Sequence, residues 1–324
     1  MKLSVLDQSV IAAGETGADA LKKTVKLAQS AEAMGYTRFW TAEHHNTNGM
    51  AGSAPEILIS HIASQTKSIR VGSGGVLLPQ YSPYKIAENF KVLEALFPNR
   101  IDLGIGRSPG GSADTRLALT DGVRRSLNEF PRQVRDLQRY LTDRDEAIKA
   151  YPKTNGLPEM WMLGITHRGA RTAAENGTAF TYGHFINPYN GQRAMKQYRS
   201  DFQPSALLKH PKVNVCIFVV CAPSQEKADE IALSQDAWLL AVEKGGDTRI
   251  PTIEEAKRKI VTQADKEKVK ENRKRMIVGT PQKVRDELLA LSDVYQTEEF
   301  MVIANVHNFE DKVQSYARLA EVML

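Results

Sequence analysis

The chain has 324 residues, which is enough for one large domain or two domains of ordinary size. Apolar residues make up 42% and charged residues 25%, as in globular proteins that bury a sizeable core. The net charge is only +5 and no apolar run approaches the roughly 20 residues of a membrane span, so neither a nucleic-acid-binding nor a membrane protein is predicted. The chain opens into a strand-like run rather than a signal peptide, so we expect a cytoplasmic protein.

In chain order, short apolar runs alternate with longer amphipathic ones, and no linker divides them. A strand over 3–6 is followed by a helix from about Gly17, whose apolar residues recur at spacings of three and four until Gly35 ends it. The further strands that we expect are 38–41, 69–72, 101–105, 160–163, 179–182, 213–220 and 300–304. The further helices that we expect are 54–65, 83–96, 167–176, 189–202, 224–242, one capped by 279–281, and 309–323.

Two segments interrupt this alternation. A longer helical stretch over 112–149 follows the fourth strand, and a charged segment over 243–275 lies late in the chain. The basic residues of 257–275 are interspersed with acidic ones, which is typical of a solvated surface. Because such a segment cannot supply a core, we expect a mobile lid or an exposed excursion there.

Eight strand–helix units with no reversed strand order predict an α/β protein. We expect a single domain over 1–324, a (β/α)8 TIM barrel with a helical insertion after strand 4 and the late charged insertion. A doubly wound open sheet is the alternative, but such sheets usually have five or six strands and a Gly-rich first turn. The first strand here ends in Leu6-Asp7-Gln8-Ser9 instead.

The two cysteines, Cys216 and Cys221, lie in one apolar run. At that spacing on a strand they point to opposite faces and are too far apart for a disulfide. We therefore expect both to be buried in a reducing compartment, with no disulfide framework and no four-cysteine zinc site.

Functional residues of a TIM barrel follow the carboxyl ends of its strands, and the second strand is followed by Glu43-His44-His45-Asn46. Adjacent strand residues point in opposite directions, and no metal-binding motif accompanies the histidines, so no metal site is predicted. We expect His45 to be structural, beneath the loop, and His44 to face the barrel mouth.

Arg107 lies among glycines after the fourth strand, in the run Gly104 to Gly111. Glycines let backbone N–H groups approach an anion, and the arginine fork matches a phosphate. After the fifth strand, Gly164-Ile165-Thr166 leads into a helix, whose first N–H groups and Thr166 hydroxyl suit a phosphate. These residues predict a phosphate site between strands four and five; an ordinary turn with a surface arginine and a threonine cap is the alternative.

Three ordered strings resemble the bacterial luciferase-like flavin-dependent monooxygenases. They are Trp40 to His45, Val71 to Pro79, and Ala87 to Phe90 continuing through Arg100 to Arg107. The match is continuous from the first strand to Gly111 and looser over 164–177 and 279–281, so it covers most of the chain. The resemblance implies a barrel that binds FMN, usually in its reduced form, across its mouth.

The resemblance also implies roles for individual residues. His44 matches the family histidine near the reactive edge of the flavin, implicated in proton transfer. Gly74-Gly75 falls where the family often has a non-prolyl cis peptide under the ring, and His184 falls where some members place an aromatic residue against the flavin. The cofactor-binding residues expected are Gly74, Gly75, Gly106, Arg107, Gly164, Ile165, Thr166, Gly169 and His184.

Two positions depart from the family pattern. Gly106 stands where luciferase has a reactive cysteine, so that thiol chemistry is absent and light emission is not implied. Gly169 stands where many relatives have a second phosphate-binding hydroxyl, which a backbone N–H could replace.

The function expected from the resemblance is a two-component, homodimeric monooxygenase. It would use O2 and reduced FMN from a separate NAD(P)H flavin reductase to oxygenate a small organic substrate. The nearest dinucleotide-binding pattern, Gly104-x-Gly106, has Pro109 at its third position, so the chain is not expected to use NAD(P)H itself. Two alternatives stay open: a deazaflavin-dependent hydride-transfer oxidoreductase and a non-catalytic flavin-binding protein.

Overall fold

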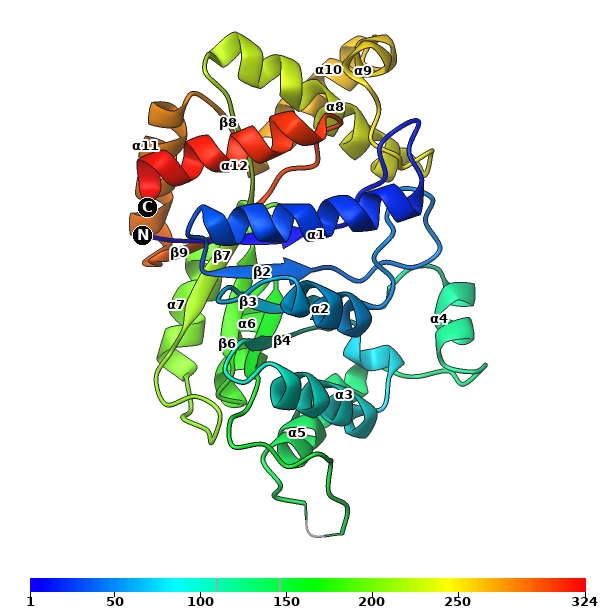
Figure 1. Ribbon diagram of the computed structural model, residues 1–324, viewed down its shortest axis with the longest axis vertical. Coiled ribbons are helices and arrows are strands. Elements are labelled where there is room, and N and C mark those ends of the chain that lie inside the picture. The colour runs from blue at the N-terminus through cyan, green and yellow to red at the C-terminus, as the bar shows by residue number, and fades with distance from the viewer. Residues whose placement is uncertain (109, 146) are drawn as a thin grey trace.

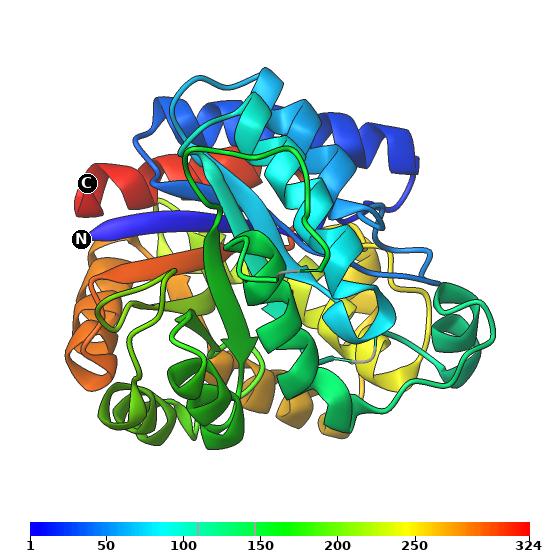
Figure 2. The same ribbon diagram turned by 90° about the horizontal axis from the view of Figure 1, so that it is seen from below.

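The computed structural model describes residues 1–108, 110–145 and 147–324, and in these residues eight parallel strands close into a barrel surrounded by helices (Figures 1 and 2). The ring is closed by the pairing of β6 with β7 and of β9 with β1. Its strands are β1 (Lys2–Asp7), β2 (Arg38–Thr41), β3 (Arg70–Val76), β4 (Ile101–Gly106), β5 (Glu159–Gly164), β6 (Ala179–Gly183), β7 (Val213–Cys221) and β9 (Glu299–Ile303). The predicted (β/α)8 barrel is confirmed.

Helices follow the strands and cover the outside of the barrel. They are α1 (Gly17–Ala33), α2 (Pro55–Ser64), α3 (Pro83–Leu96), α5 (Phe130–Leu141), α6 (His167–Glu175), α7 (Gly191–Asp201), α8 (Gln225–Lys244), α11 (Pro281–Tyr295) and α12 (Phe309–Met323). Local chemistry sets their ends, as α1 shows. Thr16 and Asp19 form a capping box at its start, and Gly35 follows its last turn with a φ of +84°.

The stretch over 112–149, expected to be largely helical, is broken. It contains α4 (Ala113–Leu119), a 3-10 turn at Leu127–Glu129 and α5. Asp121 and Gly122 have φ values of 51° and 76°, a left-handed conformation that a right-handed helix cannot continue through.

The late charged segment holds two helices, α9 (Ile253–Lys259) and α10 (Gln263–Asn272), which pack on α8. Each begins with a capping box, from Thr252 and Thr262. Most side chains of the segment are exposed, as expected; its mobility stays a prediction.

A strand beyond the predicted eight, β8 (Met276–Gly279), follows this segment. Phe218 of β7 pairs with both Met276 of β8 and Ile303 of β9, so β8 and β9 flank β7 on opposite sides. β8 was not predicted because its apolar run, Met276 to Val278, is only three residues long and adjoins the charged segment.

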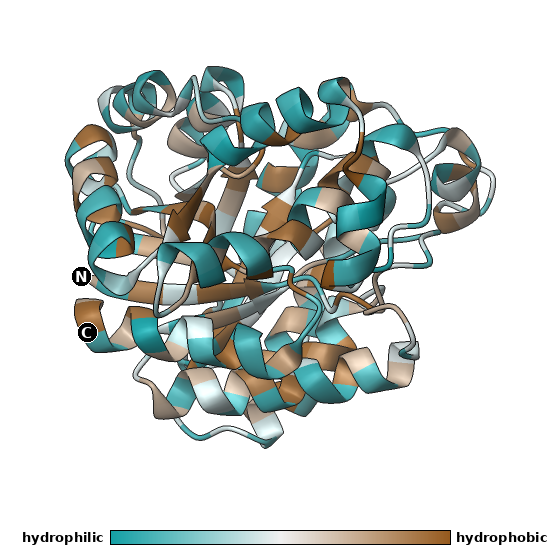
Figure 3. Cartoon of the chain, turned by 90° about the horizontal axis from the view of Figure 1, so that it is seen from above, coloured by the Kyte–Doolittle hydropathy of each residue, from teal (hydrophilic) through white to brown (hydrophobic). Residues whose placement is uncertain are grey.

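Strand residues alternate between the barrel interior and the layer beneath the helices. Trp40, Trp161 and Phe218 belong to the interior cluster, whereas Phe39 and Phe180 belong to the outer one. Apolar strands therefore lie inside a shell of helices whose outer faces are hydrophilic (Figure 3). Cys216 and Cys221 are buried, unbonded and assigned to different clusters, as expected. Among the residues described, no helix is both long and apolar enough to cross a membrane.

A buried ion network fills the barrel where its strands begin. Arg38 donates to Asp102 and Glu299, both at 2.7 Å, and its guanidinium lies 4.8 Å from the Trp161 ring. Arg70 donates to the other oxygen of Asp102 at 2.8 Å. Burial alone would raise the pKa of Asp102, but the Arg38 and Arg70 guanidinium groups hold it below its ordinary value. The network closes the end of the barrel opposite the expected site.

Candidate functional site at the carboxyl ends of the strands

The Gly74–Gly75 peptide near the end of β3 is cis, as the resemblance implied. A Cβ on Gly74 would lie 2.5 Å from Leu6 Cδ1, and one on Gly75 would lie 2.7 Å from the carbonyl oxygen of Gly104. Only glycine fits at position 75, because the contact there is with backbone, whereas a Cβ at position 74 would require the Leu6 side chain to shift. Bare backbone is therefore packed tightly between β1 and β4 at the carboxyl end of β3.

His44 follows β2, and its backbone N–H donates to Gly52. Its Nδ1 atom is buried and has no hydrogen-bond partner among the described residues. Burial, with a smaller contribution from His45, lowers the pKa of His44 to about 4, so the imidazole is uncharged at neutral pH. A buried nitrogen without a partner is costly, and a ligand that hydrogen-bonds there would remove the cost.

His45 is held by Glu43, in agreement with a structural role. Its Nε2 lies 2.7 Å from Glu43 Oε1, and the Tyr81 hydroxyl donates to the same oxygen. The other carboxylate oxygen of Glu43 accepts from the backbone N–H of Leu77 at 2.9 Å. Glu43 thus joins the loop that carries His44 to the loop after β3. This role of Glu43 was not predicted; the signal for it in the sequence is an acidic residue directly before two histidines.

Arg107 and Thr166 follow neighbouring strands, because Gly106 of β4 pairs with Leu163 of β5. Arg107 is exposed and forms no ion pair with any other described residue. Thr166 is the N-cap of α6 and accepts from the backbone N–H of Gly169 at 3.3 Å. The first N–H groups of a helix have no partner within it, so this edge of the barrel offers donors and a free cation to an anion.

The glycines here differ in what surrounds them. Of the residues that the structure describes, a Cβ on Gly106 would meet only the backbone nitrogen of Ser108, at 3.9 Å, so these residues leave space over Gly106. A Cβ on Gly164 would lie 3.0 Å from the Phe180 ring, and one on Gly183 would lie 3.0 Å from Ile165. Gly164 and Ile165 therefore pack tightly at the start of α6, whereas Gly106 leaves room beside Arg107.

His184, which the resemblance places against the flavin, packs on α11, and its contact with the flavin stays a prediction. Its Nδ1 is 2.7 Å from the Tyr295 hydroxyl of α11, and the two rings meet edge to face. Tyr182, two residues earlier, contacts the same tyrosine. The side chains at 182 and 184 thus face the helical layer, where α11 covers them, rather than the barrel interior.

Burial lowers the pKa of His184 to about 4, below the 6.5 of an exposed histidine. Between these values the unfolded chain takes up a proton that the folded chain does not, so stability falls as the pH falls from 6.5 to 4. When the pH is lowered from 7.5 to 5, the free energy of unfolding of the parent should fall by about 2 kcal/mol more than that of His184→Phe. Urea titrations at both pH values measure this difference; equal losses in parent and variant would contradict it, and His210→Phe, at an exposed position, is the control.

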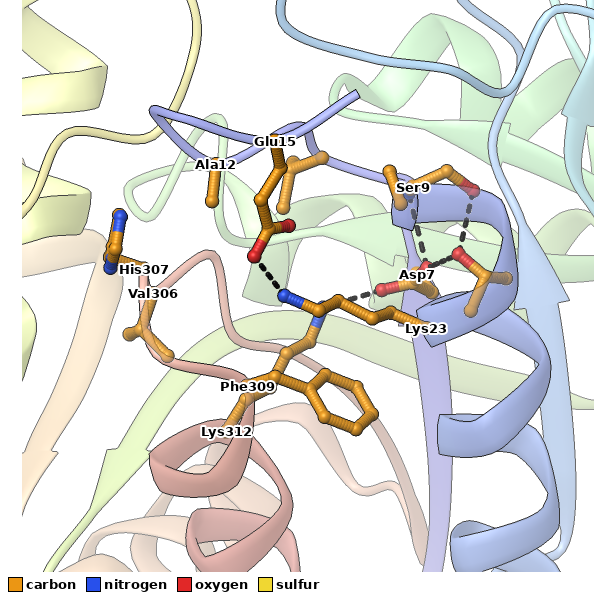
Figure 4. Close-up of a pocket in the computed structure, with 12 residues that line it drawn as sticks. Asp7, Ser9, Ala12, Glu15, Lys23, Val306, His307, Phe309 and Lys312 are labelled. Atoms are coloured by element: carbon orange, nitrogen blue, oxygen red, sulfur yellow. Dashed lines mark hydrogen bonds and ion pairs between the residues drawn. The ribbon is translucent and has the colours of Figure 1, made fainter. Parts of the chain in front are cut away.

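The pocket beside the end of β1 lies outside this site (Figure 4). Between α1 and α12, Lys312 donates to Asp7 Oδ1 at 2.6 Å, and Thr24 donates to Oδ2 at 2.6 Å. Lys23 pairs with Glu15 across the opening. The space of about 20 Å³ is close to that of one water molecule, so the pocket is a structural ion-pair cluster rather than a substrate site.

The charged segment begins at the wall of the barrel mouth. Asn48 donates to Asp247 at 3.0 Å, and the Thr47 and Thr248 hydroxyls are 2.7 Å apart. A Cβ on Gly49 would lie 1.9 Å from the carbonyl oxygen of Thr248. The loop that carries His44 is therefore in direct contact with the first residues of the segment.

Comparisons with known proteins agree with this arrangement. The sequence profile described as luciferase-like monooxygenase matches residues 1–298. The chain is 54% identical to uncharacterized protein YceB of Bacillus subtilis (strain 168), over 99% of each chain. It is 34% identical to the N-acetyl-S-alkylcysteine monooxygenase of the same organism, over 100% of this chain and 98% of that protein.

Solved structures extend the likeness to three dimensions. Apo-MsnO8 is 35% identical and superposes with a TM-score of 0.92, over 99% of this chain and 98% of that one. Two distant structures share the fold alone: the FMN complex of the oxygenating constituent of 3,6-diketocamphane monooxygenase (17% identity, TM-score 0.74) and an F420-dependent secondary alcohol dehydrogenase (14%, 0.69). Each match covers 100% of this chain; it covers 98% of the 3,6-diketocamphane monooxygenase chain and 99% of the dehydrogenase chain. From the profile match and the full-length relatives, the chain belongs to the luciferase-like monooxygenase family of oxidoreductases.

Proposed function

We propose that the protein is an FMN-dependent monooxygenase that oxygenates a small organic substrate with O2. The observation that carries this proposal is that Arg107, with no ion pair to another described residue, and the N-terminus of α6 follow the ends of two adjacent strands. That combination suits a phosphate monoester such as the one FMN carries. Bound reduced FMN would supply the electrons that activate O2.

The chain's own residues fit such a cofactor at three places. Arg107 and the first N–H groups of α6 would hold the phosphate, and the open space over Gly106 leaves room beside them. The cis peptide at Gly74–Gly75, packed between β1 and β4 at the carboxyl end of β3, would lie beneath a flat ring at the barrel mouth. His44 would direct its uncharged imidazole at the ring edge, where its unpartnered Nδ1 gains a hydrogen bond.

His44 is proposed to move a proton during the reaction. We expect His44→Ala to bind flavin within about twofold of the parent but to lower turnover by about 100-fold, in the range for general acid–base catalysis. Binding is measured by flavin fluorescence and turnover by stopped-flow oxidation of the reduced flavin. His45→Ala is the control, because its side chain is engaged with Glu43; turnover of His44→Ala at the parent rate would assign His44 a structural role instead.

The reduced flavin is proposed to come from a separate NAD(P)H flavin reductase in the cytoplasm, because the chain has no dinucleotide-binding glycine pattern. We expect oxygen consumption with NADH and FMN only after a reductase is added, and a nearly colourless protein after purification. Steady NADH oxidation by this protein alone would contradict the two-component arrangement.

A deazaflavin-dependent hydride transfer is the second candidate, favoured by the shared fold with an F420-dependent dehydrogenase. Equilibrium binding of reduced FMN and of reduced deazaflavin, each under anaerobic conditions, separates the two. Tighter binding of the deazaflavin would replace FMN in the proposal. Binding of FMN with no faster flavin reoxidation than a protein-free control would favour a non-catalytic flavin-binding protein.

We also propose a homodimer, supported by exposed apolar side chains on two adjacent helices. Ile57 of α2 is 73% exposed, and Leu96 of α3 is 60% exposed. Light scattering should give twice the 36.0 kDa mass of the chain, and Ile57→Asp should shift it towards the monomer.

A further inference from the structure

A second cleft lies at the end of the barrel where the strands begin, opposite the candidate flavin site. One wall is a face of α5, which carries Arg135, Gln138, Arg139 and Thr142 at helical spacing, with Arg144 just beyond. The other wall is the loop over 205–207, between α7 and β7. The cleft encloses about 240 Å³.

Both walls are fixed to the same turn, which connects α6 to β6. From the α5 wall, Gln138 donates to the carbonyl oxygen of Asn176 at 2.6 Å. From the loop wall, Ser205 donates to the carbonyl oxygen of Gly177 at 2.9 Å. Gly177 has a φ of +57°, and a Cβ there would lie 2.4 Å from the carbonyl oxygen of Gln203. The spacing of the walls is therefore built into the fold rather than set by mobile side chains.

The positive charge of the cleft is not neutralised within the described part of the chain. Arg139 pairs with Asp145 and, at 3.4 Å, with Asp136. Arg135 and Arg144 are exposed, and their guanidinium groups have no acid and no hydrogen-bond acceptor among the described residues. The carboxyl end of α5 contributes only a partial negative charge, about half an elementary charge, which two free guanidinium groups exceed.

We propose that this cleft binds a small organic anion that carries a phosphate group, separately from the flavin. The two free guanidinium groups, both on the α5 side of the cleft, suit the oxygens of a phosphate, and the Thr142 hydroxyl and the Leu207 side chain would contact the remainder of the ligand. Pockets for drug-sized ligands enclose about 300–1,000 Å³, so the organic part is limited to a few carbon atoms. The cleft is distant from the barrel mouth, so this inference does not depend on the proposed function.

Calorimetric titration of the full-length protein with inorganic pyrophosphate tests this. All titrations use protein that carries Arg107→Ala, because a phosphate would otherwise also bind at the candidate flavin site. We expect one remaining site in that background, and its affinity should fall at least about 30-fold when Arg135 and Arg144 are both replaced with alanine. The two side chains are exposed, so the unfolding temperature should stay unchanged and show that the fold is intact.

Arg193→Ala is the matched control, because Arg193 is an exposed arginine of α7 that is not part of the cleft. If it weakens pyrophosphate binding as much as the double variant, the effect is one of net charge and the proposal is overturned. Unchanged binding in the double variant, or no binding at all in the Arg107→Ala background, also overturns it. Tighter binding of hexaglutamate than of pyrophosphate would assign the cleft to an acidic protein segment instead.

Discussion

Replacing Asp102 with asparagine should lower the free energy of unfolding by about 3–5 kcal/mol, the cost of removing one partner from a buried ion pair. Asp102 is fully buried and accepts hydrogen bonds from Arg38, Trp40 and Arg70 at 2.7–2.9 Å. An asparagine would keep the size of the side chain but withdraw the negative charge, and the Arg38 guanidinium would stay buried with less compensation. Urea titration followed by tryptophan fluorescence measures the loss.

Glu129→Gln is the matched control, because it also removes a carboxylate that pairs with an arginine. Glu129 and Arg132 are more than half exposed, and such surface pairs contribute at most about 1 kcal/mol. If both variants lose equal stability, the buried network contributes no more than a surface pair. A loss of the size expected would show that the ion network stabilises the end of the barrel opposite the candidate site.

Replacing Arg107 with alanine should weaken FMN binding by about 10- to 100-fold, the range for a hydrogen bond to a charged group. Riboflavin has the same ring but no phosphate, so its affinity should change less than about twofold. The difference follows because Arg107, which forms no ion pair with another described residue, and the N-terminus of α6 follow two adjacent strands, where the phosphate alone would make contact. Quenching of flavin fluorescence gives both dissociation constants.

Arg107→Lys refines this test, since lysine keeps the positive charge but cannot form two parallel hydrogen bonds. We expect FMN affinity between those of the parent and the alanine variant. Equal losses for FMN and riboflavin in Arg107→Ala would place Arg107 away from the phosphate and remove the main support for the proposed cofactor.

The sequence by itself determined the barrel, because each strand and helix carries its own apolar period, and eight such units in order leave one plausible closed arrangement. It also predicted that Arg107 and Thr166 follow adjacent strands, since the carboxyl ends of parallel strands meet at one end of a barrel. The Gly74–Gly75 cis peptide, confirmed by the structure, came from the family resemblance and not from any period or spacing.

Only the tertiary structure decided what depends on residues far apart in the chain. His184 was expected at the flavin, but its direction is set by Tyr295, 111 residues later, which covers it from α11. Arg38 and Glu299, 261 residues apart, face each other because β1 alone separates β2 from β9 in the ring. The basic cleft likewise joins α5 to a loop after α7 through the turn between α6 and β6. Local periodicity fixes which face of an element is apolar, but contacts between elements depend on strand register and helix packing, which no short segment encodes.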